Sequence, residues 1–154
     1  MRFFTRRLRE SSQDSQLDPD DNAYEQRCEE ADRIASEVSL QYLEYLQIHD
    51  HQLTDSVRKL VYCPLHDARI EQAQNEDGVL KLVLDTKDAD MNRFDAITLI
   101  FLNVREASGI SQLQGQIILD TEVYIRADGS FEFSALGHRT EAHFQFEDIT
   151  ILTT

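Results

Sequence analysis

The chain has 154 residues, of which 41% are hydrophobic and 29% charged, and its formal net charge is −14 at pH 7. This length suits one domain with a proper core, and no stretch approaches the roughly 20 apolar residues that a membrane-spanning helix needs. The acidity opposes binding to nucleic acid or to an anionic membrane, because both need a basic surface, and it permits a basic protein partner. Acidity that serves only solubility is an equally good interpretation.

The N-terminal segment is basic, because residues 1–10 carry four Arg and one Glu. No apolar segment follows, so it is not a secretory signal, and Phe3, Phe4 and Leu8 suggest a short helical face instead. The two cysteines, Cys28 and Cys63, do not make a disulfide framework. We therefore expect a reduced, cytoplasmic protein.

A long helix is predicted from Asp18, which has the character of a cap before Pro19, to about His49. Its apolar residues recur at steps of three and four and form one stripe. We expect this stripe to pack on a sheet, although a dimer seam has the same pattern. The stripe comprises Tyr24, Cys28, Ala31, Ile34, Ala35, Val38, Tyr42, Tyr45 and Leu46.

A second, shorter helix should follow, capped by Asp50 or Thr54 and stopped by Pro64. Beyond it, residues 65–152 alternate between apolar and polar side chains, as half-buried antiparallel strands do. Ile97–Val104 is apolar on both faces, which predicts a central strand covered on both sides, with the helices as the cover.

The turns fix the register of two hairpins. Around Gly129 a three-residue loop pairs Ile125 with Phe131, whereas a two-residue loop would place Ile125 opposite Glu132. Gly129 should therefore adopt the left-handed conformation, with a bulge. A four-residue turn at 137–140 pairs Ala135 with Ala142. After Phe146 the apolar phase shifts, which suggests a second bulge near residues 147–148.

In the strand before the turn at Gly129, the odd-numbered residues from Ile117 to Ile125 should face the core, and the even-numbered residues should face solvent. Upstream, Ala68 and Ile70 should face Leu84 and Leu82 across a polar turn at 74–78. The predicted fold is a single α+β domain over residues 1–154. Its helical part, 1–64, should pack on an antiparallel, largely meander sheet of about six strands in 65–152.

The sheet region also resembles bacterial families of unknown function that pair a helical N-terminus with such a strand run. The resemblance lies in short pieces of sequence and covers most of the chain. It implies an α+β architecture and a bacterial cytoplasmic setting, and it supplies no catalytic residues. The pieces are Met1–Thr5, Leu65–Ala68, Phe101–Val104, Glu122–Tyr124, Asp128–Gly129, Phe131–Phe133 and Phe146–Ile149.

The weak catalytic candidates are His66 and Asp67, because a carboxylate beside an imidazole can orient a general base. Adjacent strand residues point to opposite faces, so the pair should diverge unless the backbone kinks after Pro64. Asp120, Glu122 and Tyr124 share the outward strand face and could form an acid–base or ligand-binding group, although outward acids are usually just solvated. His49 and His51 lack further ligands at suitable spacing, so we expect no metal and no cofactor.

The sequence gives no reaction, and three functions compete. A non-enzymatic protein-binding module comes first. Its acidic surface would meet a basic protein, as immunity-type proteins meet basic toxins. A homodimeric structural protein comes second, and a small-molecule-binding or metal-binding protein or hydrolase at His66 and Asp67 third. The predicted binding residues are Glu25, Glu29, Glu30, Asp32 and Glu37 on the long helix, with Asp120, Glu122 and Tyr124 on the strands.

Overall fold

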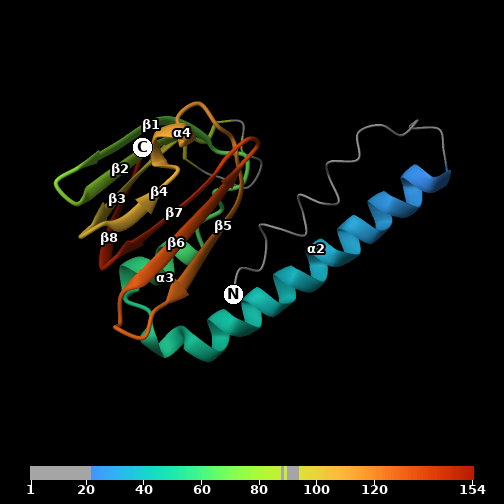
Figure 1. The fold of residues 1–154 in the computed structure, drawn as a ribbon, viewed down its shortest axis with the longest axis horizontal. Helices are drawn as coiled ribbons and strands as arrows, with labels where there is room; N and C mark the ends of the chain where they lie inside the picture. Colours follow the sequence, from blue (N-terminus) through green and yellow to red (C-terminus); the bar gives the residue numbers. More distant parts are fainter. Residues whose placement is uncertain (1–21, 88, 90–93) are drawn as a thin grey trace. The chain divides into compact units, whose positions relative to one another are not determined.

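The computed structural model describes residues 22–87, 89 and 94–154, except for the side chains of 22–25, 27 and 28. The chain divides into two compact units, Met1–Asp50 and His51–Thr154. In its described part the first unit is the helix α2 (Asn22–His49), which is continuous over its whole length (Figure 1). The predicted end at His49 is confirmed. The predicted start at Asp18 and the aromatic residues near the N-terminus lie outside the described residues.

Among the described side chains, the apolar stripe of α2 follows the predicted positions from Ala31 to Leu46, and the predicted Tyr24 and Cys28 lie outside them. Its buried side chains are Val38, Tyr42 and Leu46, which lie one helical turn apart. Tyr45 lies on the same side, where its ring contacts the rings of Tyr42 and His49 at centroid distances of 6.3 and 4.6 Å. No described helix is long and apolar enough to cross a bilayer.

Short helical turns lead into the second unit. A 3-10 turn, η1 (Asp50–Gln52), precedes helix α3 (Asp55–Val61). Of the two caps considered, Thr54 is the one used: its hydroxyl accepts a hydrogen bond from the backbone N–H of Val57 at 3.3 Å. Val57 and Leu60 on α3 join the hydrophobic core. The helix ends before Pro64, as predicted.

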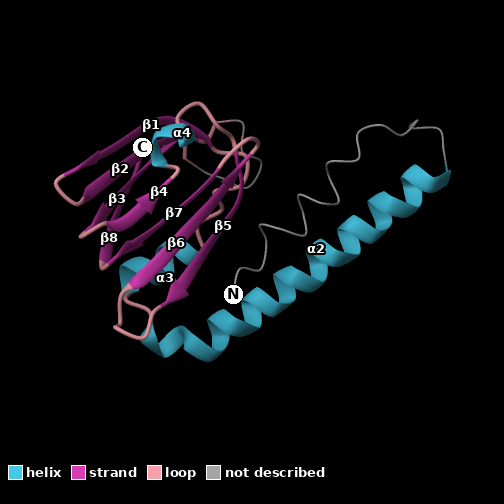
Figure 2. Cartoon of the chain, in the orientation of Figure 1, coloured by secondary structure: helices cyan, strands magenta, loops and turns pink. Residues whose placement is uncertain are grey.

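In its described residues the rest of the second unit forms eight strands in two four-stranded antiparallel sheets (Figures 1 and 2). Sheet A has the order β1-β2-β3-β8, and sheet B has the order β4-β7-β6-β5. The α+β class is confirmed, with eight strands in two sheets in place of about six in one. The strands are β1 (Arg69–Glu76), β2 (Val79–Asp85), β3 (Ala96–Leu102), β4 (Arg105–Ser108), β5 (Ile118–Ile125), β6 (Phe131–Gly137), β7 (Glu141–Phe146) and β8 (Asp148–Thr153), and helix α4 (Ile110–Leu113) lies between β4 and β5.

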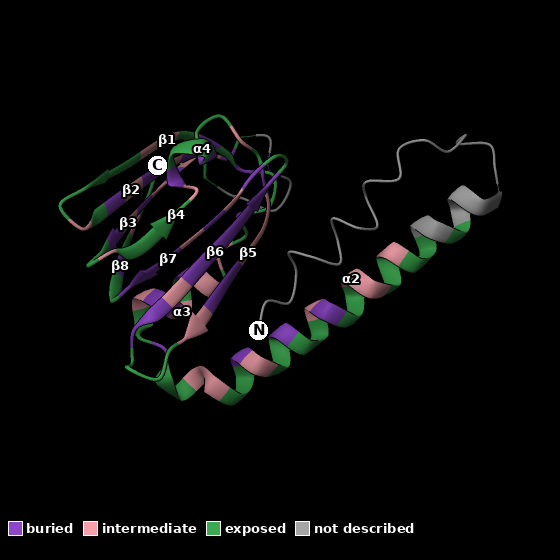
Figure 3. Ribbon diagram, viewed as in Figure 1, coloured by how far each residue is buried: buried purple, intermediate pink, exposed green. Residues whose placement is uncertain are grey.

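The core of this unit lies between the two sheets. Phe101 on β3 contacts the rings of Phe133, Phe144 and Phe146 on sheet B at centroid distances of 5.2, 4.8 and 5.1 Å. All four side chains are buried, and buried segments run along both sheets in Figure 3. Sheet B therefore covers the inner face of β3, a role that the sequence analysis assigned to helices.

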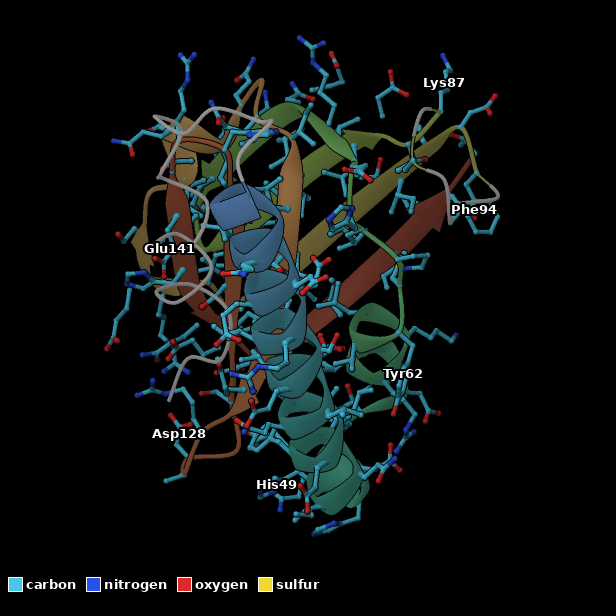
Figure 4. All side chains as sticks on the ribbon, turned by 90° about the vertical axis from the view of Figure 1, so that its right-hand side faces the viewer. His49, Tyr62, Lys87, Phe94, Asp128 and Glu141 are labelled. Atoms are coloured by element: carbon cyan, nitrogen blue, oxygen red, sulfur yellow. The ribbon has the colours of Figure 1, made fainter. Side chains whose placement is uncertain are left out.

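Both predicted hairpin registers are confirmed. Ile125 pairs with Phe131, Ala135 pairs with Ala142, and Gly129 has φ +82°. Asp128, labelled in Figure 4, stabilises the β5–β6 turn, because its carboxylate accepts hydrogen bonds from the N–H and the hydroxyl of Ser130 at 3.1 and 2.6 Å. Hydrophobic pattern and turn length together determined these registers correctly.

Irregularities at strand ends were predicted wrongly. A register shift between Ile118 and Asp120 turns Ile118 into the core, where Ile117 was expected. A second shift between Ile70 and Gln72 pairs Ile70 with Leu84, not with Leu82. The phase change after Phe146 marks the passage of the chain from sheet B to β8 of sheet A, not a bulge within one strand. Contacts between the sheets decide these positions.

Substitution of Phe101 by alanine tests the aromatic core. Phe101→Ala should lower the free energy of unfolding by about 3–5 kcal/mol, because it empties a site between the two sheets. Leu102→Ala is the matched control: Leu102 is the next residue on β3, and its side chain is 36% exposed. In denaturant titrations, Leu102→Ala should lower the free energy of unfolding clearly less than Phe101→Ala does. Equal losses for the two variants would contradict this account of the core.

Candidate functional site

The candidate catalytic pair lies in the turn between α3 and β1. His66 Nδ1 and Asp67 Oδ2 are 2.7 Å apart, and both side chains are about half exposed. The two side chains meet because the backbone of Asp67 has φ +65°. Residues other than glycine seldom adopt this left-handed conformation. This is the backbone kink without which the two side chains would have diverged.

The turn is fastened to the start of β5. On either side of the pair, Leu65 and Ala68 are buried in the core. The N–H of Asp67 donates to the carbonyl of Ile118 at 2.9 Å, and the N–H of Ile118 donates to the carbonyl of Ala68 at 2.9 Å. These bonds place the pair beside the strand that carries Asp120.

The acidity of Asp120 departs clearly from that of a free aspartate. The pKa of Asp120 is raised to about 6, chiefly by partial burial; the charge of His66 lowers it, and the negative charge of Glu122 raises it. Its carboxyl group can therefore exchange a proton near neutral pH. The structure thus brings together His66, Asp67 and Asp120, which the sequence analysis had treated as two separate candidates.

Glu122 and Tyr124 lie further along the same face of β5. Glu122 is buried and accepts a hydrogen bond from the hydroxyl of Tyr124. Outward acids on strands are commonly solvated, so burial of Glu122 departs from that expectation. Asp120, Glu122 and Tyr124 form one continuous polar strip, in agreement with their predicted common face.

Sequence analysis missed two residues in the same face of sheet B. Ser134 on β6 lies opposite Glu122 and opposite His143 on β7. Ser134 is buried, and within the described part of the chain its hydroxyl oxygen has no hydrogen-bond partner. Glu122, Ser134 and His143 form a row across three strands, and the two correctly predicted hairpin registers already imply this row. A serine–histidine–carboxylate relay needs histidine in the middle, whereas here serine lies between the other two, so the row is not such a relay.

Within the described residues no three His, Cys, Asp or Glu side chains are placed to hold a metal ion. His49 and His51 make other contacts: His49 lies against the ring of Tyr45, and His51 lies 3.3 Å from the amide nitrogen of Gln52. Cys63 is partly buried, and burial raises the pKa of its thiol, which lowers its reactivity as a nucleophile.

The predicted acidic residues of α2 form an exposed surface. Glu29, Glu30, Asp32 and Glu37 are all exposed, while Glu25 belongs to α2 but its side chain is not among those described. Arg33 pairs with Glu30 at 2.6 Å and with Glu37 at 3.5 Å, so it offsets part of the negative charge. Exposed pairs of this kind contribute little to stability.

Sequence analysis also missed the exposed apolar residues of α2. Leu40, Leu43 and Ile48 are 67%, 45% and 62% exposed. Glu29 and Leu43 are fourteen residues apart in the sequence, close to four helical turns, so acidic and apolar side chains share one side of the helix. The buried apolar stripe predicts only one side of the helix, so it gives no signal for these residues on the other sides.

Comparison with known proteins places the chain in a family. The model of the family described as Protein of unknown function (DUF4085) matches residues 3–146. The chain belongs to this family. No curated protein and no solved structure matches it. The expected resemblance to a family of unknown function is therefore confirmed.

The acidity of Asp120 can be measured by NMR titration of its carboxyl carbon. Its pKa should lie near 6, should fall in Glu122→Gln and should rise in His66→Gln, because these variants remove the neighbouring charges that act on it. A wild-type value near 4, or no response to either variant, would contradict the proposed arrangement.

The same shift makes stability depend on pH. The folded chain binds the Asp120 proton more tightly than the unfolded chain, so wild-type stability should fall as pH rises from about 4 to 6. Asp120→Asn lacks this loss and should be more stable than wild type at pH 7, by at most about 3 kcal/mol. The advantage should shrink towards pH 4. Asp128→Asn is the control of opposite sign, because hydrogen bonds from Ser130 lower the pKa of Asp128.

Proposed function

We propose that this chain is a non-enzymatic protein-binding module for a basic partner, in the manner of acidic immunity-type proteins that block basic toxins. The observation that supports it most is the exposed side of α2. Glu29 and Asp32 occupy the first half of that side, and Leu40 and Leu43 occupy the second half. Contiguous exposed apolar side chains next to charged ones are typical of interaction surfaces.

The two halves would act differently in binding. Glu29 and Asp32 add to a net charge of −14 and would attract a basic partner over a distance, which raises the association rate at low salt. Leu40 and Leu43 would supply the short-range contact, since buried apolar anchors dominate binding energy. An amphipathic helix in a partner groove is a recurrent form of such binding.

A second candidate function is chemistry or ligand binding at His66, Asp67 and Asp120. One observation favours it: Asp120 titrates near neutral pH beside an imidazole–carboxylate pair. Such a group could transfer protons to or from a bound small molecule. The protein-binding proposal ranks above it because the side chains of His66 and Asp67 are about half exposed, and a general base needs a substrate held against it.

Self-association through α2 is the remaining alternative, since the same apolar side chains could bind a second copy. The molar mass measured by light scattering over a range of concentrations tests it. A mass that rises with concentration and returns to the monomer value in Leu40→Lys would favour a structural homodimer over binding of a basic partner.

The main proposal is tested in two stages. Capture from a lysate of the source cell at low and high salt identifies a candidate partner, and binding is then measured with that partner purified. Leu40→Ser together with Leu43→Ser should weaken binding at least about tenfold, mainly through faster dissociation. Glu29→Gln together with Asp32→Asn should mainly slow association, and the effect should vanish at high salt.

Gln41→Ser is the matched control, because Gln41 is exposed on α2 and is neither acidic nor apolar. It should leave both rates unchanged. Binding that does not depend on salt, or that is equally strong in all three variants, would contradict the proposal.

A further inference from the structure

The outer face of sheet A is unusually apolar for a face turned away from the core. In β3 the residues facing sheet B, Ile97, Leu99 and Phe101, are fully buried, whereas Thr98, Ile100 and Leu102 face outward. An antiparallel sheet with one solvated face normally alternates apolar and polar residues. Here two of the three outward residues of β3 are large and apolar.

The neighbouring strands extend this apolar surface. On β8, Leu152 lies opposite Thr98, and on β2, Val83 lies opposite Thr98 from the other side. Val79 comes directly before Leu80, the partner of Phe101, and therefore lies on the same face. Side chains opposite each other on adjacent strands are in contact range. We define the outer apolar patch as Val79, Val83, Ile100, Leu102 and Leu152.

The patch is accessible in its own unit. Val79, Leu102 and Leu152 are 39%, 36% and 51% exposed, and Val83 and Ile100 are partly exposed. Three adjacent strands contribute, so the patch is one surface and not a scatter of single residues. Large exposed apolar surfaces of this kind mark interaction sites.

Charge indicates which occupant fits. Glu76, Asp85 and Asp148 lie on the same face around the patch, opposite Val79, Ala96 and Leu102 respectively. Lys81, opposite Ile100, lies within it. Arg69, opposite Asp85, is already paired with Glu71 at 3.4 Å. The border of the patch is therefore acidic.

A second copy of the chain fits this border poorly. Two copies packed through this face would bring acidic borders together, and each copy has a net charge of −14. Like charges placed across an interface cost binding energy. A segment with apolar side chains flanked by lysine or arginine satisfies both the patch and its border.

We propose that the outer apolar patch of sheet A is a docking surface for an amphipathic basic segment of a partner protein. This inference rests on the proposed function, which supplies the basic partner, and it adds a second surface that belongs to a different unit from α2.

The experiment uses the full chain, labelled with 15N, and a helical probe peptide made of leucine and lysine with an apolar side. Amide signals at Val83, Ile100 and Leu152 should shift on titration with this peptide. The matched peptide with glutamate in place of lysine should bind at least tenfold more weakly at low salt, because the acidic border repels it.

Paired variants separate the two surfaces. Leu152→Lys should weaken the response at Val83 and Ile100 at least tenfold and leave any response of α2 unchanged. Leu40→Lys is the control, because it makes the same change at an exposed leucine of the other unit. It should leave the response of sheet A unchanged. Thermal unfolding of both variants shows whether each remains folded, and Val79→Lys repeats the test at another strand if Leu152→Lys does not.

Each other outcome overturns the inference. Shifts confined to α2 would overturn the docking surface on sheet A while leaving the proposed function intact. Equal binding of both peptides would overturn the choice of a basic occupant. A mass that rises with concentration and falls in Leu152→Lys would identify a second copy as the occupant. Failure of the purified partner to bind in the preceding experiment would instead overturn the proposed function itself.

Discussion

Packing of Phe101 against three phenylalanines of the opposite sheet holds the second unit together. Each of the two sheets buries one face, and the aromatic rings fill the space between them with tilted and edge-on contacts. Once this core is formed, β3 lies in the middle of sheet A with its inner face fully buried. The positions of both surface candidates in this unit, the turn at Asp67 and the outer apolar patch, depend on that arrangement.

The turn at Asp67 shows how core packing can place chemistry at a surface. Leu65 and Ala68 are held in the core, so the two residues between them must form a tight turn. Hydrogen bonds to Ile118 then fasten this turn to β5, next to Asp120. Backbone strain of the kind seen at Asp67 costs about 1–3 kcal/mol and persists only where its surroundings impose it. Here the surroundings are the buried neighbours and the strand beside it.

Local sequence information sufficed where structure is decided locally. The length of the loop at Gly129 and the alternation on either side predicted the register of β5 and β6, and that register already placed Ser134 opposite Glu122. The irregularity after Ile118 was not predictable in this way, because it depends on the backbone bonds between Ile118 and residues 67–68, about fifty positions away in the sequence. Alternation likewise shows which side chains face inward but not which sheet lies across from them. A single sheet was therefore predicted where the structure has two. For the candidate site, the sequence named Asp120 and His66 separately, and only the fold brings them together. Leu40, Leu43 and Ile48 escaped because a helix predicted from one apolar stripe is assumed to be polar elsewhere.

The strand order of sheet A has a consequence for how the chain folds. β3 lies between β2, which directly precedes it, and β8, which is made only after all four strands of sheet B. During synthesis, β3 therefore remains an open edge, with apolar side chains on both faces, while about fifty further residues emerge at roughly 5–20 residues per second. Unpaired apolar edges recruit other chains, and contacts between distant residues slow folding. At that rate the edge of β3 stays open for several seconds, and the yield of folded protein should depend on how quickly β8 is synthesised.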